Sequence, residues 1–146
     1  MERRDFMKSC GFVCFGGIAL ATVIQSCSTT KIVSGTIDQS YLVVNLTEFE
    51  KEKTNQIDYR KFIVVQHDSL KFPVCLYRFS ETDYTALYMQ CTHQGAELQV
   101  FGDKIQCPAH GSEFSNHGLV ESGPATTPLR TFPVQIENNQ LKISLT

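Results

Sequence analysis

Two short segments of the chain each carry one cysteine and one histidine at the spacing of metal ligands. Cys91 and His93 form a Cys-x-His pair, and Cys107 and His110 form a Cys-x2-His pair, with thirteen residues between the pairs. Thiolate sulfur and imidazole nitrogen are ligands of zinc and of iron–sulfur clusters. Two such pairs facing each other could close a tetrahedral site around one ion or hold a two-iron cluster.

The strands expected around these segments explain how the pairs could meet. Glu97–Phe101 and Lys104–Cys107 flank the dipeptide Gly102-Asp103, a pattern that predicts a tight β-hairpin. One pair precedes this hairpin and the other follows it. Because the two ends of a hairpin lie side by side, we expect the two pairs to face each other.

The remaining sequence predicts an all-β domain of antiparallel sheets, with the two hairpin loops as a separate metal-binding part. No segment of useful length has a helical period. Glu48–Lys61 carries eight charges in fourteen positions and is expected to be a solvated loop, with room for a short helical turn. The further strands expected are Tyr41–Leu46, Phe62–Gln66, Phe72–Phe79, Tyr84–Gln90, Phe132–Ile136 and Leu141–Leu145.

Composition excludes some classes of function and leaves few other candidate ligands. A chain of 146 residues with a net charge of −2 suggests one domain and has no broad basic face for nucleic acid. Its six cysteines are not spaced as a disulfide framework. Cys75 lies in a strand pattern and is expected to be a small buried side chain. His67 and His117 lie in turn-like segments, where we expect them to face solvent.

The residues around the two pairs resemble those of the Rieske [2Fe–2S] proteins. The matching segments are Cys-Thr-His-Gln-Gly at 91–95 and Cys-Pro-Ala-His-Gly-Ser-Glu-Phe at 107–114. The resemblance continues through Gly-Leu-Val at 118–120 and Gly-Pro-Ala-Thr-Thr-Pro-Leu at 123–129. The last segment resembles the proline-containing loop that covers the cluster in this family.

The resemblance implies a [2Fe–2S] cluster as the cofactor and a role for each residue of the two pairs. Cys91 and Cys107 would hold one iron, and His93 and His110 the other. Two neutral imidazoles in place of two thiolates favour the reduced form, which gives Rieske centres potentials of about −150 to +300 mV. The family therefore implies one-electron transfer.

Five neighbouring residues are expected to support the cluster. Gly95 and Gly111 allow tight loops and close approach of the backbone, and Pro124 would stiffen the covering loop. Ser112 matches the serine that bonds a bridging sulfide in the family. Phe114 stands where the branch found in cytochrome bc complexes has a tyrosine that bonds a ligand sulfur.

The chain also lacks the disulfide of that branch. The two additional loop cysteines of the bc-type proteins are replaced here by Ala96 and Ala109. This indicates a disulfide-free branch of the family. Without the tyrosine hydroxyl, we expect a potential below the upper end of the Rieske range.

Three functions are compatible with this pattern. The first is an electron carrier, or a small subunit of an oxidoreductase, which works with an unidentified redox partner protein. The second is the quinol-oxidising subunit of a bc-type complex, and the third is a binding module with a structural Cys2His2 zinc site. Catalysis by the chain alone is not expected, because Rieske oxygenases need a second iron held by two His and a carboxylate, and only four His are present.

The N-terminus predicts export across a bacterial inner membrane. Arg3 and Arg4, followed by Phe6 and Lys8, resemble the twin-arginine motif of proteins exported in a folded state. The uncharged stretch that follows, Cys10–Ile24, is too short for an ordinary spanning helix. An ordinary Sec signal and an uncleaved anchor are the alternatives.

A possible lipidation site follows the apolar stretch. Ile24, Ser26 and Cys27 resemble a relaxed lipoprotein box, which would make a lipidated Cys27 the mature N-terminus. The protein would then face the periplasm while anchored to the membrane. The expected organisation is a signal peptide at 1–26, a tether at 27–36 and the Rieske domain at 37–146.

Overall fold

The structure is a computed structural model that describes residues 30–53 and 56–146. The twin-arginine motif, the apolar stretch and Cys27 lie outside these residues. Fifteen strands and one short 3-10 helix make up the regular structure of the described part, which confirms the all-β prediction. Within the same part, no helix is long and apolar enough to cross a membrane.

The strands of the central sheet come from three separate parts of the chain. Its order is β1-β6-β7-β8-β13, with β1 parallel to β6 and every other neighbouring pair antiparallel. The strands are β1 (Ile32–Ser34), β6 (Phe62–Gln66), β7 (Val74–Arg78), β8 (Tyr84–Tyr88) and β13 (Thr131–Phe132).

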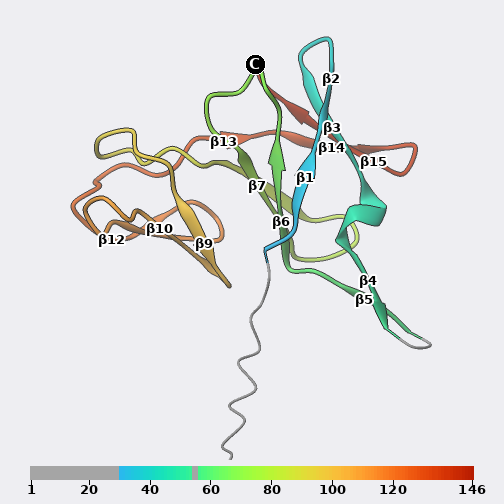
Figure 1. Ribbon diagram of the computed structural model, residues 1–146, viewed down its shortest axis with the longest axis horizontal. Helices are drawn as coiled ribbons and strands as arrows, with labels where there is room; N and C mark the ends of the chain where they lie inside the picture. Colours follow the sequence, from blue (N-terminus) through green and yellow to red (C-terminus); the bar gives the residue numbers. More distant parts are fainter. Residues whose placement is uncertain (1–29, 54–55) are drawn as a thin grey trace, which may run out of the picture.

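Two four-stranded antiparallel sheets lie on either side of the central one (Figure 1). The first contains β14 (Val134–Glu137), β15 (Gln140–Ser144), β3 (Tyr41–Asn45) and β2 (Thr36–Asp38), in that order. The second contains β12 (Val120–Ser122), β11 (Glu113–Ser115), β10 (Lys104–Gln106) and β9 (Gln99–Phe101). The second sheet includes the hairpin predicted between the two ligand pairs.

Residues of the central sheet alternate between two hydrophobic cores. In β6, Ile63 and Val65 belong to the core shared with the β14-β15-β3-β2 sheet. Phe62 and Val64, which point to the opposite face, belong to the core shared with the β9–β12 sheet. A strand buried on both faces is a continuous apolar run rather than an alternating one, and this explains the unbroken Phe-Ile-Val-Val sequence at 62–65.

The tether expected at 27–36 has to be corrected where it overlaps the described residues. Ile32–Ser34 forms β1, which is registered against Val64–Gln66 of β6. The pairing is extended by the Val64 N–H, which donates to the Lys31 carbonyl at 2.9 Å. The three-residue strand was too short to be recognised by its pattern, and the folded domain therefore begins near residue 31 rather than at 37.

The charged segment Glu48–Lys61 is also more ordered than predicted. The short helical turn exists as the 3-10 helix η1 (Leu46–Phe49), but β4 (Glu50–Lys53) and β5 (Gln56–Tyr59) then form a hairpin instead of a solvated loop. Apolar periodicity could not indicate it, because the hairpin is held by its own backbone ladder and by polar contacts such as Lys51 to Asp58 at 3.8 Å.

Candidate metal centre

The loop that carries Cys91 and His93 is closed by its own backbone. The Cys91 N–H donates to the Ala96 carbonyl at 2.8 Å, and the Gly95 N–H donates to the Cys91 carbonyl at 2.8 Å. Gly95 has a φ of 73°, in the left-handed region that glycine adopts without strain. The glycine is therefore needed to turn the chain back toward β9.

The loop that carries Cys107 and His110 repeats this arrangement. The Cys107 N–H donates to the Ser112 carbonyl at 2.8 Å, and the Gly111 N–H donates to the Cys107 carbonyl at 2.9 Å. Gly111 has a φ of 78°. Counted from each cysteine, the two segments therefore have the same backbone hydrogen bonds. The sequence does not show this equivalence, because the histidine is one residue farther from the cysteine in Cys-x2-His than in Cys-x-His.

The loops place two thiols inside and two imidazoles outside. Cys91 and Cys107 are each 2% exposed and belong to the same hydrophobic core. His93 and His110 are exposed, and their ring centroids lie 5.0 Å apart with the planes at 87°. The two thiols are therefore brought together on the buried side and the two imidazoles on the surface.

The backbone around Cys107 favours a thiolate. Burial by itself raises the pKa of the Cys107 thiol, but backbone hydrogen bonds from His110 and Ala109 and a side-chain bond with Cys91 outweigh burial, so the pKa is lowered. Bonds of this kind stabilise negative charge on sulfur. The same groups would stabilise a metal-bound thiolate.

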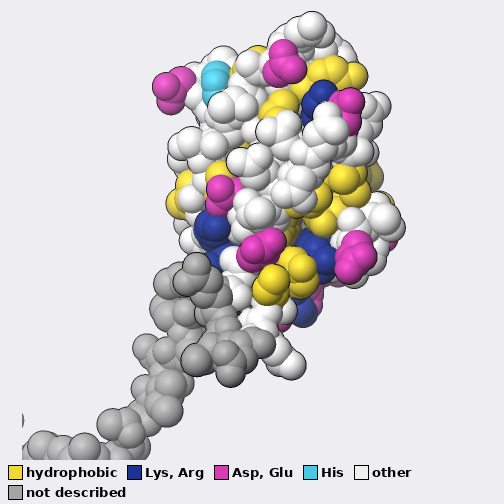
Figure 2. Space-filling view, turned by 90° about the vertical axis from the view of Figure 1, so that its right-hand side faces the viewer, with side chains coloured by type: hydrophobic (Ala, Val, Ile, Leu, Met, Phe, Trp, Pro, Cys, Tyr) yellow, Lys and Arg dark blue, Asp and Glu magenta, His cyan; other side chains and the backbone are white. Residues whose placement is uncertain are grey.

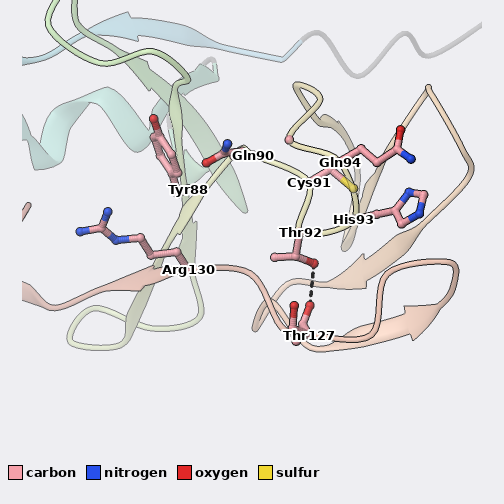
Figure 3. A pocket seen from close by; sticks show the side chains of 9 residues that line it. Tyr88, Gln90, Cys91, Thr92, His93, Gln94, Thr127 and Arg130 are labelled. Carbon is pink, nitrogen blue, oxygen red and sulfur yellow. Dashed lines mark hydrogen bonds between the residues drawn. The ribbon is translucent and has the colours of Figure 1, made fainter.

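The proline-containing segment is linked to both loops. The Ala125 N–H donates to Ser112 Oγ at 3.0 Å, and Thr92 Oγ1 donates to the Thr127 carbonyl at 2.7 Å (Figure 3). Pro124 lies in the same segment and is exposed. Thr92 was not singled out from the sequence, because a threonine between two ligand candidates forms no pattern by itself.

Ser112 has the environment expected for a residue that bonds the cluster. Its side chain is fully buried, and its oxygen accepts the bond from Ala125. Within the described part of the chain, the Ser112 hydroxyl donates no hydrogen bond of its own. A buried hydroxyl that has an acceptor for its proton is more stable than one without, so Ser112 fits a site in which the cofactor supplies that acceptor.

Phe114 is fully buried in the core that contains Cys91 and Cys107. Its position on β11 is opposite Ile105 of β10. A benzyl side chain there fills space beside the thiols but donates no hydrogen bond. Ala96 packs against the same core, and Ala109 is exposed.

An open hollow of about 420 Å³ lies beside His93 (Figure 3). It leaves room for a group of another molecule next to this imidazole. Its lining combines polar side chains with the aromatic ring of Tyr88 and the thiol of Cys91. The lining residues are Tyr88, Gln90, Cys91, Thr92, His93, Gln94, Gly95, Thr127 and Arg130.

Within residues 30–53 and 56–146, one further cysteine and two further histidines are present, and they do not join the site. Cys75 is fully buried, as predicted, and burial raises the pKa of its thiol. His117 is exposed and stacks on Phe79, with ring centroids 4.5 Å apart. His67 is half-buried rather than fully solvent-facing, and its Nδ1 lies 2.7 Å from Ser69 Oγ.

The donor set fits two metal ions better than one. The two thiols lie on the buried side, and the two imidazoles lie on the surface with ring centroids 5.0 Å apart. A structural zinc needs four ligands at one point, whereas a Rieske centre takes two thiolates on one iron and two imidazoles on the other. The chemistry of the residues present therefore fits a [2Fe–2S] cluster.

The family and the relatives found by comparison with known proteins agree with one another. The model of the Rieske [2Fe-2S] domain matches residues 39–133. The cytochrome b6-f complex iron-sulfur subunit of Chlorobaculum tepidum is 35% identical over 63 residues, which are 42% of this chain and 35% of that protein. The ferredoxin CarAc of Metapseudomonas resinovorans is 34% identical over 76 residues, 49% of this chain and 70% of that protein. The chain thus spans about a third of the length of this b6-f subunit and most of the ferredoxin.

Solved structures agree with the fold. The plasma membrane Rieske protein PetC3 from Synechocystis has a TM-score of 0.50 at 28% identity, with 57% of this chain and 86% of that chain covered. A chain of the complex of reduced oxygenase and oxidised ferredoxin in carbazole 1,9a-dioxygenase has a TM-score of 0.52 at 26% identity, with 74% and 95% covered.

Proposed function

The chain belongs to the Rieske [2Fe–2S] family, and on this premise we propose that it transfers single electrons as a membrane-tethered carrier or as the small subunit of an oxidoreductase. One observation carries the proposal: two loops of like backbone geometry hold two buried thiols beneath two exposed imidazoles. Cys91 and Cys107 hold one iron in this proposal, and His93 and His110 hold the other.

The residues on the buried side of the site and those on its exposed side have different roles. When bound, the cluster takes up and gives up one electron at about −150 to +300 mV, the range of Rieske centres. The backbone N–H groups near Cys107 stabilise the negative charge on sulfur. His93 and His110 lie at the surface, where a partner protein can approach closely.

A role as the quinol-oxidising subunit of a bc-type complex is the second candidate. Its support is the similarity to subunits named for the cytochrome b6-f complex. Three residues make this role less well supported. Ala96 and Ala109 stand in place of the two disulfide-forming cysteines of that branch, and Phe114 stands in place of its tyrosine. The chain also spans 70% of the ferredoxin CarAc but only 35% of the Chlorobaculum subunit. The carrier role therefore has the stronger support.

We further propose that the protein is exported in a folded state and anchored through Cys27. Its support is the sequence pattern of Arg3, Arg4 and Cys27. An oxidising compartment would tend to pair free thiols, so insertion of the cluster before export protects Cys91 and Cys107. Globomycin treatment and Cys27→Ala should each leave the signal peptide uncleaved, so the apparent mass of the protein should increase. An unchanged size would contradict lipidation.

The electron-transfer proposal is tested by spectroscopy of the full chain. After aerobic purification, the visible spectrum and the low-temperature EPR spectrum of the dithionite-reduced protein should show a Rieske centre. His93→Ala and His110→Ala should each abolish that signal, while His117→Ala and His67→Ala, which change histidines away from the site, should keep it. A colourless wild-type protein that contains zinc would overturn the proposal.

A further inference from the structure

The exposed large hydrophobic side chains are concentrated at one end of the domain. The described residues include seven such side chains, and six of them belong to β1, the β4–β5 hairpin, the β9–β10 hairpin or the segments that follow β7 and β11. Ile136, in the β14–β15 hairpin, is the exception. The chain enters β1 at the lower end of the domain in Figure 1. The six are Ile32, Ile57, Tyr59, Phe79, Phe101 and Leu119, and we call this region the entry end.

We infer that the entry end lies on the lipid bilayer and inserts these six side chains among the headgroups, so that His93 and His110 face the aqueous phase. The inference rests on the proposed membrane tether. It adds an orientation of the electron-transfer site relative to the membrane.

Backbone pairing brings the strand termini together at the entry end. The Arg78 N–H at the end of β7 donates to the Lys61 carbonyl just before β6, at 2.8 Å. The Val64 N–H of β6 donates to the Lys31 carbonyl at 2.9 Å, and Ile32 at the start of β1 lies opposite Val64 in the middle of β6. The beginnings of β1 and β6 and the end of β7 therefore form one edge.

Side-chain contacts extend this edge to two other parts of the chain. Arg78 lies over the ring of Tyr59 at 4.1 Å, so the β4–β5 hairpin with Ile57 adjoins β7. Phe79 stacks on His117, in the turn that leads to Leu119.

The tip of the β9–β10 hairpin adjoins the same edge. The Tyr77 hydroxyl donates to the Gly102 carbonyl at 3.0 Å, next to Phe101. In Figure 2, hydrophobic side chains lie among basic and acidic ones at the lower end of the described surface. Phenylalanine, tyrosine and aliphatic side chains of this kind are suited to the interfacial layer of a bilayer.

The chain outside the described residues indicates what covers the entry end. Cys27, the proposed lipidation site, precedes Ile32 by five residues. Five residues span at most about 18 Å when fully extended. A lipid attached at Cys27, or an apolar anchor at Cys10–Ile24, would therefore hold the bilayer close to this end of the domain.

Two described lysines of this end are paired with acidic side chains, and Arg78 lies over the ring of Tyr59. Lys61 Nζ lies 3.0 Å from Asp103 Oδ2, and Lys31 Nζ lies 2.7 Å from Glu48 Oε2. Attraction to anionic lipids needs unpaired positive charge. We therefore expect contact with the bilayer to depend on apolar insertion and to change little with salt or with the fraction of anionic lipid.

The redox site lies away from the entry end. β10 runs from Lys104, at the hairpin tip, to Gln106, and Cys107 follows. Three residues of strand cover about 10 Å, and His110 lies beyond Cys107. Since the hollow beside His93 then opens to water, this orientation predicts a partner protein in the aqueous phase rather than a redox molecule within the bilayer.

Single tryptophans can report the orientation, because the chain contains no tryptophan. We would place the cluster-loaded full chain in vesicles of phosphatidylethanolamine and phosphatidylglycerol, with and without brominated acyl chains. Ile57→Trp and Leu119→Trp are the reporters. Gln66→Trp, at the opposite end of β6, and Ile136→Trp are the controls. The EPR signal of each variant verifies that the site is intact.

Brominated lipid should reduce the emission of both reporters about twofold or more and that of the controls by less than about 10%, because interfacial side chains reach only about 5–10 Å into the bilayer. The difference should persist from 0.1 M to about 1 M salt, where the screening length falls from about 10 to 3 Å. Equal quenching of all four variants overturns the orientation, and loss of quenching at high salt overturns apolar insertion. A chain that fails to float with the vesicles refutes the tether and the orientation together.

Discussion

Substitution of Phe114 by tyrosine should raise the midpoint potential of the protein. Phe114 is fully buried in the same hydrophobic core as Cys91 and Cys107. The tyrosine at this position in the bc-type branch donates a hydrogen bond to a ligand sulfur. In Phe114→Tyr the new hydroxyl should do the same, and because the sulfur becomes more electron-rich on reduction, the bond stabilises the reduced state more.

The expected size of the shift follows from the energy of one such bond. A hydrogen bond to a charged acceptor contributes about 1.5–3 kcal/mol. For a one-electron couple, about 1.4 kcal/mol corresponds to 59 mV, so the midpoint should rise by about 60–130 mV. The assay is a redox titration followed by EPR, at one pH for both proteins.

A matched control distinguishes the effect of this hydrogen bond on the midpoint potential from the effect of adding an oxygen atom to a packed core. Phe49 is equally buried, but it belongs to the other core, with the β14-β15-β3-β2 sheet. Phe49→Tyr should leave the midpoint unchanged. If Phe114→Tyr lowers the free energy of unfolding by about 1–3 kcal/mol, as a buried unpaired hydroxyl does, and leaves the midpoint where it was, the reasoning is refuted. A wild-type midpoint near the upper limit of the Rieske range, about +300 mV, would also contradict it.

Three further predictions concern Ser112, Cys75 and Gly118. Ser112→Ala should lower the midpoint by about 60–130 mV in a redox titration, because a buried donor is lost from the site; an unchanged midpoint would mean that Ser112 only positions Ala125. Burial raises the pKa of the Cys75 thiol, so this thiol stays protonated in the folded protein, whereas in the unfolded chain it ionises above about pH 8.5. The free energy of unfolding should therefore fall by about 1.4 kcal/mol per pH unit above that value. Urea unfolding at pH 8 and pH 10 should show a smaller fall in Cys75→Ala than in the wild type. Gly118→Ala should lower the free energy of unfolding by about 1–3 kcal/mol, since its φ is 79° and a Cβ would lie 2.8 Å from Leu87 Cδ2; Gly102→Ala, at φ 60° with nothing within 4 Å of its Cβ, should lower it less.

The sequence by itself predicted the strands that have strong local signals. Phe62–Gln66 forms a strand with the predicted bounds, and the predicted strands at Tyr41, Phe72 and Tyr84 are present with shorter ends. An apolar run of β-forming residues between turns has few alternatives. The charged β4–β5 hairpin and the three-residue strand β1 were missed, because the backbone pairing that stabilises them leaves no apolar pattern.

The chemical identity of the candidate site was also readable from the sequence. The types and spacing of Cys91, His93, Cys107 and His110 limit the metals and clusters that could bind. The glycines after them are placed where the loops need a positive φ.

Only the tertiary structure decided how these residues are arranged. The burial of the two thiols beneath exposed imidazoles depends on the β9–β12 sheet packing against the central one, a contact between residues distant along the chain. The tertiary structure also joins Thr92 to Thr127, which are 35 residues apart in the chain. Sequence patterns carry the chemistry of a residue and its local conformation, whereas distances between remote segments are set by how the sheets pack.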